Sequence, residues 1–281
     1  MWMLLVLLYG VLKGCREIVK KKSLEKNTVM EVLFLYTLLS FLMLIPDMPK
    51  VDRLPVTLLL PVALKSFVIF VAWICSFKAI SHLPISYYGI LDLSRVLFAT
   101  LLGVIVLEEH LGTFQVIGLL LVCSGLLLLK CRKKGTGQEE KVSALYVMMA
   151  LLSCMLNAVS GLMDKLLMRQ MNSASLQFYY MFFLVLFYAV YILISRTKIR
   201  FKSVWSNYWI WLLSLMFVVA DRALFIANGM EQSRVTVMTL IKQSGCVVTI
   251  LAGKFIFHEK NIGYKLFCAA VIVCGIVIAV L

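Results

Sequence analysis

The stretch LPISYYGILDLSRVLFATLLGVIVLEEHL (83–111) decides the fold that the sequence predicts. A Leu-Pro turn signal is followed by an apolar segment over 85–107 and then by an acidic turn. An apolar segment of about 20 residues is typical of a transmembrane helix. Because charges are rare inside such helices, Asp92 and Arg95 indicate either a functional site or a structural ion pair three residues apart.

The same pattern returns 150 positions later, in SRVTVMTLIKQSGCVVTILAGKFIFHEKN (233–261). Equivalent positions share serine, glycine or glutamate: Ser94 and Ser244, Gly103 and Gly253, Glu109 and Glu259, Gly125 and Gly275. A shift of 147 places Gly14 and Glu17 on Gly161 and Asp164. An ordered set of matches in nearly one frame indicates an internal repeat.

The composition requires lipid as the solvent for much of the surface. Hydrophobic residues make up 62% of the 281 positions and charged residues 15%, whereas a soluble domain is nearer half apolar and a quarter charged. The runs do not alternate as β-barrel strands do, and helices satisfy their own backbone in lipid. We expect ten transmembrane helices, over 1–19, 29–46, 57–80, 85–107, 113–130, 144–167, 176–195, 208–229, 235–257 and 262–281.

The predicted fold class is therefore an all-α integral membrane protein with two inverted five-helix repeats. The first repeat covers 1–130, a polar loop covers 131–143, and the second repeat covers 144–281. Because five is odd, the second repeat enters the membrane in the opposite direction to the first. Such inverted repeats support alternating access, since exchanging the conformations of the halves turns an outward-open state inward.

The net charge of +14 comes mainly from basic residues at helix ends, which argues against a nucleic-acid partner. The connections after the odd-numbered predicted helices hold 14 Lys and Arg, and those after the even-numbered ones hold four. The positive-inside rule then places the odd connections in the cytoplasm and both termini outside. We expect a multi-pass protein of the cell (plasma) membrane whose partners are the lipid bilayer and a small-molecule substrate. The choice between monomer and homodimer stays open.

The repeated segments resemble the EamA-like branch of the drug/metabolite transporter superfamily. The resemblance lies in Leu83-Pro84-Ile85-Ser86, Gly103, Leu107-Glu108-Glu109-His110-Leu111, Gln115, Gly118 and Gly125, repeated in part as Gly253, Phe257-His258-Glu259-Lys260 and Gly275. The second copy departs where Asn261, Lys265 and Cys268 stand at the positions of Leu111, Gln115 and Gly118.

The resemblance implies ten helices around a central cavity that helices 3, 4, 8 and 9 line. It also implies export or exchange of small metabolites, with amino acids and related compounds common. Many proteins of that family keep their termini inside, contrary to the charge bias here, so the direction of transport stays open.

The candidate substrate-binding residues are polar or aromatic side chains within the predicted helices, because a charge in mid-bilayer costs about 2.5–3.5 kcal/mol and usually faces a cavity or a partner. They are Asp92, Arg95, Lys242, Gln243, Asp221, Arg222, Lys65 and Trp73. Asp92 is also the candidate for coupling to a proton, since burial favours a neutral carboxyl group. Glu17 and Asp164 are expected at solvated helix ends, and Glu109 and Glu259 are expected to cap adjacent segments.

The mixed signs of these charges favour a secondary transporter for amino-acid-like or zwitterionic solutes. A phosphorylated or nucleotide-type cargo is the alternative, and it requires two or more of the basic candidates to converge. A non-transporting membrane assembly protein is the alternative of another class. No His-rich cluster, paired-carboxylate motif or Gly-rich phosphate loop indicates an enzyme, a metal or a cofactor.

Overall fold

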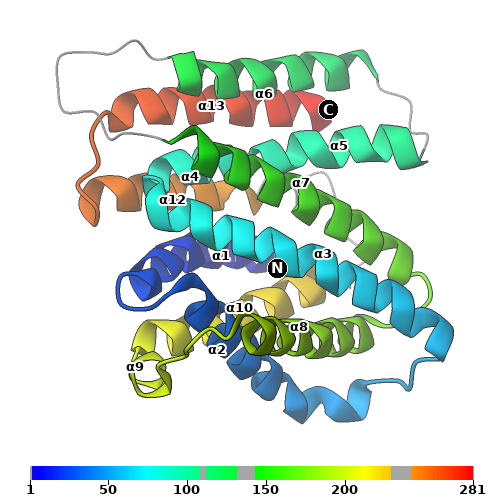
Figure 1. Cartoon of the computed structure of the whole chain (residues 1–281). Helices are drawn as coiled ribbons and strands as arrows, with labels where there is room; N and C mark the ends of the chain where they lie inside the picture. Colours follow the sequence, from blue (N-terminus) through cyan, green and yellow to red (C-terminus); the bar gives the residue numbers. More distant parts are fainter. Residues whose placement is uncertain (1, 108–111, 132–142, 229–241, 281) are drawn as a thin grey trace.

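The computed structural model describes residues 2–107, 112–131, 143–228 and 242–280, and over these residues it is helical with no strands. Figure 1 shows the helices, whose bounds are α1 (Trp2–Leu24), α2 (Val29–Leu44), η1 (Ile45–Lys50), α3 (Val56–His82), α4 (Ile85–Asp92), α5 (Ser94–Leu107), α6 (Thr113–Cys131), α7 (Ala144–Leu167), α8 (Ser173–Ser195), α9 (Phe201–Trp205), α10 (Tyr208–Asn228), α12 (Ser244–Phe255) and α13 (Ile262–Val280).

Each of the ten predicted segments contains at least one of these helices. The fourth segment is interrupted at Leu93, between the end of α4 and the start of α5, and the first part of the ninth, 235–241, lies outside the described residues. Five helical stretches have the length and hydropathy of membrane spans: Val29–Lys50, Val56–His82, Ile85–Gly103, Ala144–Asp164 and Ser173–Ser195. The helical architecture fits a membrane protein, and ten crossings remain a prediction.

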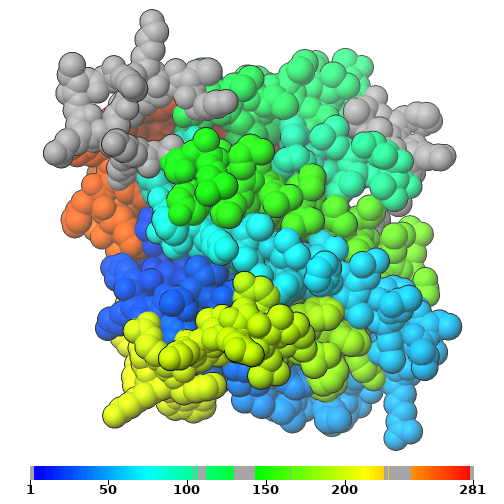
Figure 2. Space-filling model, viewed as in Figure 1, coloured from blue at the N-terminus to red at the C-terminus, as the bar shows by residue number. Residues whose placement is uncertain are grey.

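The outer surface has the character expected of a surface that faces lipid. Leu60, Ile105 and Leu193 are each at least 75% exposed. In the space-filling view of Figure 2, side chains of α3 and α7 form a closely packed band across the face. Exposed apolar side chains on this scale are rare on soluble monomers. Polar side chains that form a site are therefore expected inside the bundle.

The helix contacts relate the two halves by a pseudo-symmetry. Helix α1 packs on α10, and its counterpart α7 packs on α3; α1 also contacts α12, and α7 contacts α5. Helix α3 packs on α8, and in the same way α10 packs on α2. Two further contacts join counterparts directly, α2 with α8 and α6 with α13, and the last pair lies side by side in Figure 1. Helix α4 packs on α12, which is the counterpart of α5. Exchanging the halves thus maps the main contacts onto one another.

Glycines show that counterpart helices run antiparallel. A Cβ atom added at Gly125 would lie 3.2 Å from the carbonyl oxygen of Cys268, and one at Gly275 would lie 2.7 Å from that of Gly118. Residue numbers therefore rise along α6 while they fall along α13. These two contacts exchange under the 150-residue shift, so the same close approach occurs twice.

Glu259 fixes the position of α4, which carries Asp92. Its carboxylate accepts hydrogen bonds from the backbone N–H of Ile85 and Ser86, from the Ser86 hydroxyl, and from Lys265 Nζ at 2.9 Å. A carboxylate at a helix N-terminus satisfies free N–H groups and complements the helix dipole. Glu259 is thus a cap, as expected, but the helix that it caps belongs to the other half. Glu109 lies outside the described residues.

Candidate functional site

Helix α1 brings a row of polar side chains into the interior. Tyr9, Lys13, Arg16 and Lys20 are three or four residues apart, so they share one face of the helix. Because Gly14 lacks a side chain, α12 approaches closely: a Cβ at Gly14 would lie 2.6 Å from the carbonyl oxygen of Gly245. The charged face of α1 is thereby held against the second half of the chain.

Asp92 lies at the break between α4 and α5 and binds two cations. It is 8% exposed, and its carboxylate oxygens lie 2.7 Å from Lys13 Nζ and 2.8 Å from an Arg95 Nη atom. The structural i, i+3 pair is therefore present, and Lys13 extends it to a triad that the sequence pattern does not indicate. Broken helices are a common way in which transporters build polar sites.

Lys242 and Gln243 come from the matching level of the second half. Gln243 shares with Lys13, Glu17 and Asp92 the lining of a cavity of about 10 Å³, which is about the space that one water molecule needs. Lys242 Nζ lies 5.9 Å from the centre of the Tyr9 ring. Positions 92 and 242 thus face one polar region without pairing directly.

Asp221 and Arg222 point to different parts of the molecule. Asp221 faces α1, with its carboxylate 4.0 Å from an Arg16 Nη atom. Arg222 forms an ion pair with Asp47 of η1. Both residues of this second pair line a larger cavity of about 380 Å³ between η1 and the start of α8, which also includes Gln177.

Lys65 is the most deeply buried charge of the candidate set, at 2% exposed. Its Nζ lies 2.9 Å from an Asp164 carboxylate oxygen and 3.8 Å from the centre of the Tyr180 ring. An ammonium group held so close to a carboxylate and an aromatic face is compensated in part for its loss of water. Lys65 thereby joins α3 of the first half to α7 and α8 of the second.

The prediction of a solvated helix end is wrong for Glu17, which is 8% exposed and binds Lys20 at 2.6 Å. Asp164 keeps 37% of its side chain exposed and is the partner of Lys65. Glu17 lies near a helix end in the sequence, yet neighbouring helices cover it. Sequence position alone does not show this covering.

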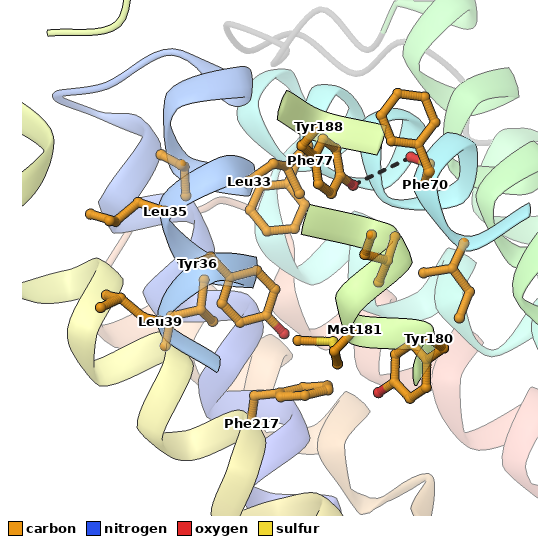
Figure 3. Close-up of a cluster of buried hydrophobic side chains, with 14 of the residues drawn as sticks. Leu33, Leu35, Tyr36, Leu39, Phe70, Phe77, Tyr180, Met181, Tyr188 and Phe217 are labelled. Atoms are coloured by element: carbon orange, nitrogen blue, oxygen red, sulfur yellow. Dashed lines mark hydrogen bonds between the residues drawn. The ribbon is translucent and has the colours of Figure 1, made fainter. Parts of the chain in front are cut away.

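Trp73 packs in an aromatic cluster of the hydrophobic core. Its ring centre lies 5.3 Å from that of Tyr36 and 6.0 Å from that of Phe217. Figure 3 shows Tyr36 and Phe217 beside Tyr180 in this cluster. The Arg16 guanidinium carbon lies 5.4 Å from the Phe217 ring centre, so the cluster borders the polar core. The rings contact one another, so a cargo could stack on Trp73 only if these side chains rearranged.

The structure thus gathers most of the candidate residues into one polar core, which we define as the ion pairs of α1, α3, α4, α5, α7 and α10 together with Lys242 and Gln243. Arg222 lies apart from this core with Asp47, and Trp73 lies at its aromatic border. Tyr9, Lys13 and Arg16 were not predicted. The only sequence signal for them is their spacing on one face of the first helix.

An apolar exterior around a polar core, with that core between two repeated halves, is the construction of a multi-pass membrane transporter. The sequence matches the EamA-like transporter family over residues 1–131 and 144–281, and the chain belongs to that family. The resemblance seen in the sequence is therefore confirmed. No curated protein matches the chain.

One crystal structure, described only as that of a protein, has a similar fold. Its TM-score is 0.66 at 16% sequence identity, and the match covers 99% of this chain and 96% of the other. At this level of identity the likeness shows the fold alone.

The Lys65–Asp164 pair gives a stability prediction. Asp164→Asn leaves a buried ammonium group without its carboxylate, so we expect a loss of about 1–3 kcal/mol in the free energy of unfolding. The additional change Lys65→Met removes the unpaired charge, and the double variant is expected to recover most of the loss. Denaturation of the protein in detergent measures both.

Glu25→Gln is the matched control, because it breaks the exposed Lys22–Glu25 pair and is expected to change stability little. An Asp164→Asn variant as stable as this control would show that the pair does not hold α3 against α7.

Proposed function

We propose that this protein is a secondary transporter that moves small polar metabolites across the cell membrane by alternating access. The observation that carries the proposal is the pair of ionic contacts between the halves, Arg16 with Asp221 and Lys65 with Asp164. Charges inside a membrane protein are expensive and usually serve a pathway or a binding site. Contacts at an interface that can open are suited to releasing and accepting a polar solute.

The packing supports two inverted repeats. Counterpart helices α6 and α13 are antiparallel, and the main helix contacts are exchanged when the halves are exchanged. Two halves that enter the bilayer in opposite directions give this arrangement. Ten crossings, five in each half, would place the halves in that way, because five is an odd number. A small rotation of one half against the other would then convert an outward-open state into an inward-open state.

The two ends of the bundle differ, which supports a state open to one side. At the end of the odd-numbered connections, Glu259 caps α4, and Lys21 Nζ donates to the Leu83 carbonyl oxygen at 2.6 Å. The cavity of about 380 Å³ lies at the opposite end. If the charge bias sets the orientation, this conformation is closed to the cytoplasm and faces outward.

Asp92 remains the candidate for proton coupling. Its carboxylate holds both Lys13 and Arg95, and two cations this close favour the charged form of the carboxylate. Proton uptake is therefore expected in a conformation in which these cations have moved away, and protonation would then keep α1 apart from the junction of α4 and α5. The mixed signs of the polar core fit solutes that carry both charges, such as amino-acid-like metabolites.

Solute flux in proteoliposomes tests the function. We expect counterflow of at least one of L-glutamate, L-alanine, putrescine and glucose 6-phosphate, driven further by a pH gradient. Asp92→Asn keeps the size of the side chain but not its titration, so we expect it to remove the response to the gradient. Glu25→Gln is the control and keeps the full response.

Absence of flux for every solute, with folded protein in the liposomes, would contradict the transporter. A response to the pH gradient that survives in Asp92→Asn would remove the coupling role and leave the transporter.

The closed end gives a separate prediction. In a cysteine-free background, Leu83→Cys is expected to react slowly with a maleimide, because Leu83 is 1% exposed beneath the Glu259 cap. Adding Glu259→Gln weakens that cap, and we expect labelling to become several-fold faster. Equal rates with and without Glu259→Gln would show that this contact does not close the end.

A further inference from the structure

The polar core contains more cations than carboxylates among the described residues. Its cations are Lys13, Arg16, Lys20, Lys65, Arg95 and Lys242. Its carboxylates are Glu17, Asp92, Asp164 and Asp221. Six cations and four carboxylates leave an excess of two positive charges, in a place where uncompensated charge is costly.

The short ion pairs show where the excess lies. Glu17 and Asp164 each have one close cation, and Asp92 has two. Asp221 is the remaining carboxylate, and at 4.0 Å from Arg16 it neutralises that residue only weakly. Lys242 forms no ion pair with any carboxylate in the part of the chain that the structure describes. The cations with least compensation are therefore Arg16 and Lys242.

Tyr9 links the two cations. Lys242 Nζ is 5.9 Å from the Tyr9 ring centre, and Arg16 is seven residues from Tyr9, on the same face of α1. Arg16 and Arg95 each bury an Nε atom that has no hydrogen-bond partner among the described residues. The site thus offers unused donors, positive charge and a phenol hydroxyl, which are the groups that bind carboxylate or phosphate.

We infer that the cargo carries a net negative charge and that its anionic group binds between Arg16 and Lys242, beside the Tyr9 hydroxyl. The inference rests on the proposed transport function and narrows it to organic anions, such as acidic amino-acid-like compounds, dicarboxylates or phosphate esters. The long Arg16–Asp221 contact matters here, because an anion can bind Arg16 without first breaking a short ion pair.

Binding to the purified full-length protein in detergent tests the inference without requiring transport. The probes for calorimetric titration are succinate, inorganic phosphate, L-alanine and putrescine. We expect an anion to bind more tightly than alanine or putrescine, and succinate against phosphate distinguishes the two anion chemistries. Arg16→Gln and Lys242→Gln each remove a charged donor and are expected to weaken that binding at least about tenfold.

Lys254→Gln is the matched control, because Lys254 is an exposed cation at the far end of the helix that follows Lys242. It removes the same charge from the chain and is expected to leave anion binding unchanged. Tyr9→Phe removes only the hydroxyl and is expected to weaken binding by a smaller factor. Thermal unfolding without ligand shows which variants are folded. If Arg16→Gln does not fold, the binding measured with Lys242→Gln decides the test.

Preferred binding of alanine or putrescine, or anion binding that persists in the folded Arg16→Gln and Lys242→Gln variants, would overturn the inference. Flux of neutral or cationic solutes without anion binding would keep the transporter and overturn the anion site. Anion binding that these variants lose, in a protein without flux, would support the anion site and overturn the transporter.

Discussion

The rest of the structure depends on pairing charges inside a bundle whose exterior is apolar. Lys65 is 2% exposed and cannot reach water, so it must meet Asp164. Arg16 also reaches across to a carboxylate of the other half, that of Asp221, at the longer distance of 4.0 Å. In both cases the partner lies in the other half, because the interface between the halves is the polar interior of the bundle. The pairs stabilise the closed interface, but removing either partner leaves a costly charge, so they are suited to a contact that exchanges partners.

Small residues allow the two halves to pair closely enough for these contacts to form. Gly14 lies against Gly245, Gly89 against Thr249, and Gly275 against Gly118. Helices in lipid gain no hydrophobic stabilisation from association, so close backbone approach and dispersion supply much of the attraction. The glycine contacts and the Glu259 cap position α4, and α4 in turn ends at the carboxylate of Asp92. Local sequence choices and the site are therefore linked through the packing of counterpart helices.

Most of the fold could be predicted from the sequence, whereas much of the site could not. Hydropathy and the 150-residue repeat located the helices, because lipid forces long apolar runs. Asp92 and Arg95 were predicted as a pair from their spacing, but Lys13 joins them from 79 positions away. Glu17 appeared to lie at a solvated end because a sequence does not reveal that α10 and α12 cover α1. Trp73 shows the same limit, since an aromatic residue in mid-helix can face either a cavity or a packed cluster.

The central claim is that two equivalent halves cross the membrane in opposite directions and enclose the polar core between them. Labelling of equivalent connections from one side of the membrane tests this claim most directly. Lys50 and Lys198 are exposed residues in corresponding connections of the two halves. In intact cells, with a cysteine-free background, an impermeant maleimide is expected to label only one of Lys50→Cys and Lys198→Cys. The charge bias makes Lys50→Cys the labelled one, and Lys198→Cys should react only after permeabilisation. Labelling of both positions from the same side would contradict the account.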